Sequence, residues 1–313
     1  MNKSSKIYIA GHTGLIGSAL VRKYQKEGYI NILTRTHQEL DLTDHKKVTN
    51  FFHKQTPEYV ILAAAKVGGI QANSAHPAQF LTENILIQNN VILSALKYGV
   101  KKLLFISCGC AYPTNAKQPI TEEYLLSGKL EQTNEGFAIA KIAGMKLCET
   151  INLEYKKDFI SCIAANTYGE QDHFDEKRSH VISALIKKFH HAKIEKLQNV
   201  AIWGTGTARR EFIYVDDLAD GLHILMQEYS DPNTINVGSG QEFTIKQLSE
   251  MIQNVVGYEG EVTFDLSKPE GMNRRIFDSS KINNLGFKPQ VSFEEGIKRT
   301  YEYYLSMKVP QTP

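Results

Sequence analysis

The stretch Lys-Ile-Tyr-Ile-Ala-Gly-His-Thr-Gly-Leu-Ile-Gly-Ser, from Lys6 to Ser18, decides the fold predicted for this chain. It begins with a short apolar run, which predicts a strand, and it leads into a helical pattern that continues to Glu27. Between the two, glycines at Gly11, Gly14 and Gly17 leave room for the backbone to approach a pyrophosphate, whose charge the helix N-terminus attracts. This order of elements predicts a dinucleotide-binding turn.

Similar apolar runs recur along the first half of the chain and alternate with helical patterns. The runs cover residues 30–33, 59–65, 102–107 and 159–165, and the helical patterns cover residues 44–54, 77–98 and 134–155. Strands that alternate with helices in this way predict an α/β fold, namely a Rossmann-like doubly wound parallel sheet with helices on both faces.

After residue 166 the pattern is less regular. The predicted elements are a polar loop at 168–177, helices at 179–192 and 217–228, strands at 198–203, 211–215, 234–237 and 262–265, and a last helix at 293–304. We expect the strands at 211–215 and 234–237 to return to the first domain. The predicted domains are therefore a dinucleotide-binding domain of residues 1–165 with 211–243, and a smaller α/β substrate domain of residues 166–210 with 244–313.

Composition limits the class of protein. The 313 residues carry a formal net charge of +2 with basic and acidic residues interspersed, which disfavours nucleic acid and membrane as partners. The four cysteines have neither the density of a secreted disulfide scaffold nor the spacing of a zinc site, so we expect no metal and a reducing cytoplasm. The N-terminal residues lack the apolar segment of a signal peptide, and no later run is long enough to cross a bilayer.

The end of the second predicted strand bears on the choice of cofactor. An Asp or Glu there would bind the free 2′-hydroxyl of NAD, whereas this chain has Arg35, with His37 close by. A cation at this place suits the 2′-phosphate of NADP; the alternative is that Arg35 is a solvated surface residue. Asp41 follows and is expected at the adenine edge. We therefore predict NADP as the cofactor.

Several further segments carry a family resemblance. They are residues 63–70 (Ala-Ala-Ala-Lys-Val-Gly-Gly-Ile), 138–144 (Ala-Ile-Ala-Lys-Ile-Ala-Gly), 179–182 (Ser-His-Val-Ile) and 203–212, which run from Trp-Gly-Thr-Gly-Thr to Arg-Glu-Phe. Together with the glycine turn, these segments resemble the GDP-L-fucose synthase family of extended short-chain dehydrogenases/reductases. The resemblance extends over essentially the whole chain.

This resemblance implies a two-step reaction on a GDP-4-keto-6-deoxy sugar, in which epimerisation at carbons 3 and 5 is followed by reduction of the ketone with NADPH. Related enzymes act on GDP-heptoses or make GDP-colitose, so a hexose and a heptose are both candidates. A homodimer is implied as well. The implied cofactor contacts, in addition to the glycines, Arg35 and Asp41, are Leu15, Ile16, Ala63, Ala65, Lys141 and His180.

Inversion of two carbons next to a ketone requires a base and an acid on opposite faces of the sugar ring. The resemblance places Cys110 as the base and His180 as the acid, and both residue types titrate near neutral pH when their surroundings are tuned. The alternatives are structural, with Cys110 as a small buried residue at a strand end and His180 as the residue that starts a helix.

Reduction requires a proton donor for the oxygen at carbon 4, and here the chain departs from the family. The family has a Tyr, a Lys four residues later, and a Ser or Thr that holds the ketone oxygen. In this chain the corresponding residues are Phe137, Lys141 and Cys108, with Ser107 one position out of register. Phe cannot donate a proton, and a thiol is a weak hydrogen-bond donor. Three accounts follow: an engineered residue, slow reduction with Lys141, Cys108 or water as the donor, or a protein that only epimerises.

The GDP moiety calls for basic and aromatic side chains. We expect substrate contacts at Asn166, Lys188, Trp203, Arg210 and Arg274, with a solvated charge as the alternative for each base. Sugar 4,6-dehydratases place acidic residues after the Ser or Thr position, where this chain has Gly109 and Cys110, so dehydration is disfavoured. The functions that remain are an epimerase/reductase, an epimerase, and a non-catalytic nucleotide-sugar-binding or redox-sensing protein.

Overall fold

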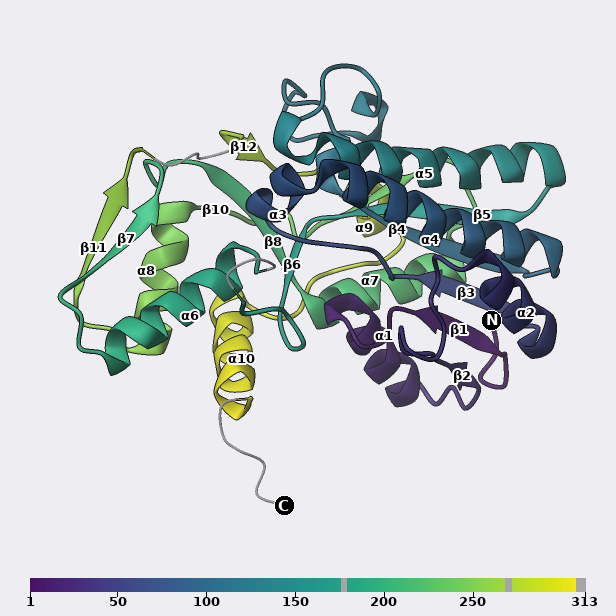
Figure 1. Ribbon diagram of the computed structural model, residues 1–313, viewed down its shortest axis with the longest axis horizontal. Helices are drawn as coiled ribbons and strands as arrows, with labels where there is room; N and C mark the ends of the chain where they lie inside the picture. The colour runs from purple at the N-terminus through teal and green to yellow at the C-terminus, as the bar shows by residue number, and fades with distance from the viewer. Residues whose placement is uncertain (176–178, 268–271, 308–313) are drawn as a thin grey trace.

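The structure is a computed structural model that describes residues 1–175, 179–267 and 272–307. Within these residues, six parallel strands form the larger sheet, in the order β2-β1-β3-β4-β5-β9 (Figure 1). They are β1 (Ile7–Ala10), β2 (Ile32–Leu33), β3 (Tyr59–Leu62), β4 (Lys102–Cys108), β5 (Asp158–Ala164) and β9 (Ile235–Val237). The prediction of a doubly wound parallel sheet is confirmed.

Helices cover both faces of the larger sheet. They are α1 (Leu15–Lys26), α2 (His45–Gln55), α4 (Pro77–Lys97), α5 (Glu135–Tyr155), α7 (Val215–Glu228) and the short α9 (Ser280–Asn284). The short α3 (Ile70–Ala75) packs instead against α4 and the 3₁₀ turn at Gln132–Asn134. Helix α1 packs against α7, whereas α4 packs against α2 and α5. Because the strand order runs outward from β1 in two directions and crossovers between parallel strands are right-handed, α1 and α4 lie on opposite faces.

Close packing of α5 on β4 positions the residues of interest. Every residue of β1 is buried, as expected for a parallel sheet covered on both faces, and the same holds for most of β4. A Cβ added at Gly144 of α5 would lie 2.5 Å from the ring of Phe105 in β4, so glycine permits this contact. The N-terminal half of α5, with Phe137 and Lys141, therefore lies against the carboxyl end of β4, where Cys108 is.

The other strands form a smaller region beside the larger sheet (Figure 1). They are β6 (Asn166–Tyr168), β7 (Asn199–Trp203), β8 (Arg209–Tyr214), β10 (Glu242–Thr244), β11 (Glu261–Asp265) and β12 (Arg274–Arg275). Its helices are α6 (Val181–Ile194), α8 (Ile245–Val256) and α10 (Phe293–Ser306). Short 3₁₀ turns, η1 (Gly109–Ala111), η2 (Glu122–Tyr124) and η3 (Gln132–Asn134), lie between β4 and α5 in the chain.

The two later strands expected to return to the first domain pair with different sheets. β9 joins that sheet beside β5, but β8 pairs with β6, β10 and β12 outside it. The apolar side chains of β8 are buried by an aromatic cluster, in which Phe293 lies 5.8 Å from Phe212 and 5.4 Å from Tyr168 between ring centroids. Apolarity predicts that a strand is buried, but it does not select the partner strand. The division of the residues into two domains stays a prediction.

Several element limits differ from the prediction by a few residues. Helix α1 begins directly after Gly14, and β6 occupies the start of the predicted polar loop at 168–177. Residues 176 and 177, at the end of that loop, lie outside the described residues. In the described part of the chain, no helix combines the length and the apolarity needed to cross a membrane.

Candidate active site

A cleft of about 800 Å³ lies at the carboxyl ends of the strands of the larger sheet. Its lining includes the glycine turn after β1, Ala63 to Ala65 after β3, and Ser107 to Cys110 at the end of β4. The smaller region contributes Arg210 of β8 and Arg275 of β12. Open α/β sheets bind their ligands at this edge, so the cleft is the candidate active site.

The glycine turn fits a pyrophosphate. Gly11 has a φ of +87°, and a Cβ there would lie 2.7 Å from the backbone nitrogen of Ala64. A Cβ on Gly17 would lie 2.0 Å from the carbonyl oxygen of Gly11. Both positions therefore require glycine. No side-chain hydrogen bond caps α1 at Gly14, which leaves the first N–H groups of the helix available to a phosphate.

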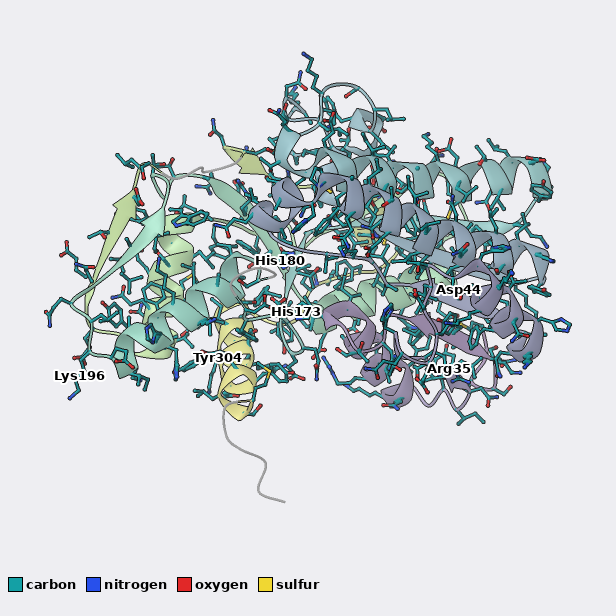
Figure 2. All side chains as sticks on the ribbon, viewed as in Figure 1. Arg35, Asp44, His173, His180, Lys196 and Tyr304 are labelled. Carbon is teal, nitrogen blue, oxygen red and sulfur yellow. The ribbon has the colours of Figure 1, made fainter. Side chains whose placement is uncertain are left out.

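The other cofactor contacts expected from the sequence line the same cleft: Leu15, Ile16, Arg35, Asp41, Ala63, Ala65, Lys141 and His180. Arg35 lies at the edge of the larger sheet near β2 (Figure 2), with its guanidinium 5.5 Å from the ring centroid of Phe51. Its Nη1 donates to the carbonyl of Thr34 at 2.6 Å. Hydrogen bonds from the hydroxyl and backbone N–H of Thr43 lower the pKa of Asp41. A fixed guanidinium at this place fits a 2′-phosphate.

Cys108 and Cys110 form a close pair of thiols where β4 passes into η1. Their sulfur atoms are 2.9 Å apart, a contact that spacing alone did not predict. The hydrogen bond with Cys110, assisted by the cations of Lys141 and Arg275, lowers the pKa of Cys108 to about 7. The same hydrogen bond, together with burial, raises the pKa of Cys110. Two groups coupled so closely titrate as a unit, which loses its first proton more easily and its second less easily than an ordinary thiol does.

Lys141 is buried on α5 beside the thiol pair. Its ammonium donates to the carbonyl of Ile106 at 2.9 Å and lies 4.7 Å from the ring centroid of Phe105. Burial lowers the pKa of this ammonium. The Phe137 ring lies 5.7 Å from the Lys141 nitrogen and packs edge-on against Phe80, with 6.3 Å between centroids. An apolar ring, which cannot donate a proton, thus lies beside the ammonium of Lys141.

Ser107 and Cys108 are neighbours on β4, and both line the cleft. Successive side chains on a strand point to opposite faces of the sheet, and both residues belong to β4. The hydroxyl oxygen of Ser107 is buried and has no hydrogen-bond partner among the described residues. The roles predicted for the Cys108 thiol and the Ser107 hydroxyl at the end of β4 stay predictions.

His180 is the N-cap residue of α6 and lines the same cleft as Cys110. Figure 2 shows it near His173, between the larger sheet and the smaller region. His173 and Asp172 also line the cleft, and the buried carboxylate of Asp172 accepts hydrogen bonds from the hydroxyl of Ser183 and from the backbone nitrogen of His173. Sequence reasoning did not single out His173, because it lies in an irregular segment without a periodic pattern.

The predicted substrate contacts divide into two groups. Asn166 and Arg210 line the cleft, whereas Lys188, Trp203 and Arg274 are not among its described lining residues. Lys188 donates to the carbonyl of Ala201 in β7, and Trp203 lies at the exposed end of that strand. Arg274 is held by Glu242, whose two carboxylate oxygens lie 2.8 and 2.7 Å from its Nε and Nη2. The roles given to these residues stay predictions.

Arg275, which sequence reasoning missed, lines the cleft next to the thiol pair. Its Nη2 lies 2.8 Å from the sulfur of Met272, and its Nε is buried without a hydrogen-bond partner among the described residues. Successive side chains of a strand point to opposite faces. Because the side chain of Arg274 points toward Glu242, that of Arg275 points to the opposite face, where the cleft lies. A guanidinium with an unused buried N–H is suited to bind an anion such as a diphosphate.

Comparisons with known proteins place the chain in a family. The NAD dependent epimerase/dehydratase family matches residues 7–238. GDP-L-fucose synthase 1 of Arabidopsis thaliana is 50% identical over 304 residues, which cover 97% of this chain and 94% of that protein. The crystal structure of a GDP-6-OMe-4-keto-L-xylo-heptose reductase from C. jejuni is similar with a TM-score of 0.92 at 40% identity, and the alignment covers 98% of this chain and 99% of that one.

A second similar structure contains a bound cofactor. MlghC, a GDP-mannoheptose C4 reductase from Campylobacter jejuni with NADP bound, has a TM-score of 0.89 at 42% identity, with 97% of this chain and 99% of that chain covered. The similarity extends over both the larger sheet and the smaller region. The chain therefore belongs to the NAD dependent epimerase/dehydratase family and, within it, to the GDP-L-fucose synthase family, whose members are NADP-dependent oxidoreductases and epimerases of nucleotide sugars.

Proposed function

We propose that this protein epimerises a GDP-4-keto-6-deoxy sugar, a hexose or a heptose, at carbons 3 and 5 and reduces it slowly at carbon 4 with NADPH. The observation that carries the proposal is that the glycine turn, the thiol pair, Lys141 and His180 line one cleft. The relatives named as a GDP-L-fucose synthase and as GDP-heptose reductases support the class of substrate.

Epimerisation is assigned to the thiol pair and His180. The ketone acidifies the hydrogens on carbons 3 and 5, so a base on one face of the ring removes a proton and an acid on the other face returns one. The negative charge of the pair lies first on Cys108, whose pKa is the lower of the two. Because the sulfur atoms are 2.9 Å apart, Cys110 can pass its proton to the Cys108 thiolate before it takes a ring proton, at a cost set by its higher pKa. Cys110 is then the base and His180, at the start of α6, is the acid.

Reduction depends on a different proton. NADPH supplies the hydride when it is bound. The oxygen on carbon 4 then requires a proton, which Phe137 cannot give. Cys108 is partly exposed in the cleft, and its pKa of about 7 makes the thiol a better acid than an ordinary cysteine. We assign Cys108 as the donor, and we expect slow reduction because a thiol also holds the ketone oxygen weakly.

A second candidate function is epimerisation alone. It is favoured by the packing of Phe137 edge-on against Phe80 and beside the Lys141 ammonium, which surrounds the lysine with apolar rings. In that case the dinucleotide completes the cleft without reacting. The two candidates share Cys110 and His180 and differ only in whether hydride leaves the cofactor.

One experiment separates these functions. The protein is incubated with NADPH and GDP-4-keto-6-deoxy-D-mannose in deuterated water, and NADPH absorbance and deuterium in the recovered sugar are both measured. Deuterium uptake with loss of NADPH is the expected result. Uptake without NADPH loss would replace the proposal with an epimerase, and the absence of both would leave a nucleotide-sugar-binding protein.

Arg35→Ala is expected to weaken NADPH binding by roughly tenfold to a hundredfold and to leave NADH binding nearly unchanged. The reason is that hydrogen bonds to a charged group contribute about 1.5–3 kcal/mol, and each 1.4 kcal/mol is about tenfold in affinity. Binding is measured by titrating cofactor fluorescence. Lys47→Ala, which removes another cation near this edge, is the control. Equal losses for both cofactors would show that Arg35 does not recognise the 2′-phosphate.

A further inference from the structure

Two cysteines in the cleft are separated by a single residue in the chain, and their sulfur atoms lie close together. The sulfur of Cys108 lies 2.9 Å from that of Cys110, which is about 0.9 Å more than a disulfide bond of about 2.05 Å. The other cysteines are Cys148 in α5 and Cys162 in β5, where burial raises the pKa of both thiols. Cys108 and Cys110 therefore have sulfur atoms that lie close together, and both residues line the cleft.

The turn between the two cysteines keeps them side by side at the cleft. Cys108 is the last residue of β4 and is partly exposed, and both cysteines line the cleft. A Cβ added at Gly109 would lie 2.6 Å from the ring of Phe277 and 3.1 Å from Cδ of Arg275. Glycine at this position therefore lets Arg275 of β12 and Phe277, two residues later, pack closely against the turn.

Charged groups around Cys108 favour its thiolate. Cys110 contacts it from η1, and the cations of Lys141 on α5 and Arg275 on β12 act on it from two other elements. Cys162 of β5 acts electrostatically on Lys141. The thiolate, rather than the thiol, reacts with oxidants, and electropositive surroundings with partial exposure are the conditions under which cysteines do so.

We propose that Cys108 and Cys110 are an oxidation site that closes a reversible disulfide inside the cleft when a peroxide enters it. The Cys108 thiolate attacks one peroxide oxygen, the O–O bond breaks, and the leaving hydroxide is protonated to water. The sulfur of Cys110 then loses its proton and attacks the sulfenic acid of Cys108, whose oxygen leaves as a second water. Two thiols are thus oxidised by two electrons while one hydrogen peroxide is reduced to two waters.

Formation of the disulfide consumes the thiol of Cys108 and prevents Cys110 from forming a thiolate. Oxidation therefore stops any chemistry that either sulfur performs. A dithiol reductant restores both thiols by exchange. This inference goes beyond the proposed function, because oxidation of the pair requires no sugar and no nicotinamide. Its test can therefore succeed or fail independently of the reaction assigned to the cleft.

The test follows the mass of one peptide. Reduced full-length protein is treated with hydrogen peroxide, alkylated with iodoacetamide and digested with trypsin. Lysines at 102 and 117 flank both cysteines, so residues 103–117 are released as one peptide. The expected peptide is about 2 Da lighter than the dithiol, unalkylated, and fully alkylated after prior treatment with dithiothreitol. Complete alkylation after peroxide, or only irreversible oxygen adducts, would overturn the proposal.

Single variants identify the attacking sulfur. Cys110→Ser is expected to stop at a sulfenic acid on Cys108 that dimedone traps. Cys108→Ser is expected to react at least about tenfold more slowly with peroxide, because the remaining thiol is buried. Cys148→Ala should form the disulfide as the unchanged protein does. Equal trapping in both single variants, or loss of the disulfide in Cys148→Ala, would contradict the assignment.

The rate of disulfide formation is expected to rise as the pH is raised through about 7. The sign follows because the thiolate attacks, and its fraction increases with pH until Cys108 is ionised. A rate that rises only near the pKa of an ordinary thiol, about 8.5, would show that Cys110, Lys141 and Arg275 do not activate Cys108.

Discussion

Phe137→Tyr is expected to raise the rate of NADPH oxidation with a GDP-4-keto-6-deoxy sugar by at least about tenfold, because general acid catalysis contributes roughly a hundredfold to ten-thousandfold. The ring at this position lies 5.7 Å from the nitrogen of Lys141, close enough for the ammonium to favour ionisation of a phenol. The hydroxyl would also line the cleft that contains Cys108. The measurement is the initial rate of NADPH absorbance loss at saturating sugar.

The control for this change is Phe137→Leu, which alters the packing against Phe80 without adding an acid. Its rate should not exceed that of the unchanged protein. The pH profile gives a second readout. With Cys108 as the donor, the rate should fall as the pH rises through about 7, because the thiol loses the proton that it must give. The tyrosine variant should keep its rate above that pH. Equal rates for the tyrosine variant and the unchanged protein would show that a missing acid does not limit reduction.

Cys110→Ala is expected to lower deuterium incorporation at carbons 3 and 5 by roughly a hundredfold to ten-thousandfold, because the base that removes the ring protons is lost. NADPH binding should be unchanged, since the glycine turn and Arg35 lie elsewhere in the cleft. The variant also removes the hydrogen bond that lowers the pKa of Cys108, so less thiolate remains at neutral pH. Mass spectrometry of the sugar recovered from deuterated water measures the exchange.

Cys148→Ala is the matched control, because it deletes a thiol that is buried in α5 outside the cleft. It should retain the exchange rate even if it lowers the free energy of unfolding by leaving a small cavity. Persistent exchange in Cys110→Ala would remove Cys110 from the mechanism and leave Cys108 or His180 as the base. Loss of exchange in both variants would indicate a general effect on folding, which a thermal unfolding curve would reveal.

Most of the cofactor half of the cleft could be predicted from sequence. Gly11, Gly14 and Gly17 follow a buried strand directly, so their roles depend on neighbours in the chain. Periodicity likewise located the strands and helices of the larger sheet, because burial on both faces requires apolar runs. The absence of a phenol at Phe137 was also visible, since one residue type decides whether a proton donor exists.

The substrate half could be predicted only in part. Asn166 and Arg210 were placed in the cleft, but of two adjacent arginines the sequence argument selected Arg274, which Glu242 holds, and missed Arg275, which lines the cleft. Two adjacent arginines on a strand point to opposite faces, but the sequence does not indicate which of them faces the cleft. That choice depends on the carboxylate of Glu242, which is distant in sequence.

The amino-acid sequence by itself determined the glycine turn, the alternation of strands and helices, and the presence of Phe137, which cannot donate a proton, four residues before Lys141, because each depends on backbone sterics, side-chain period or residue type within a short segment. Only the tertiary structure decided that β8 leaves the larger sheet, that Arg275 faces the cleft, and that the sulfur atoms of Cys108 and Cys110 lie 2.9 Å apart beside Lys141. These features depend on packing between segments distant in the chain, here α5, β4 and β12. The pKa of Cys108 changes with that packing, and so does the chemistry available to the thiol pair.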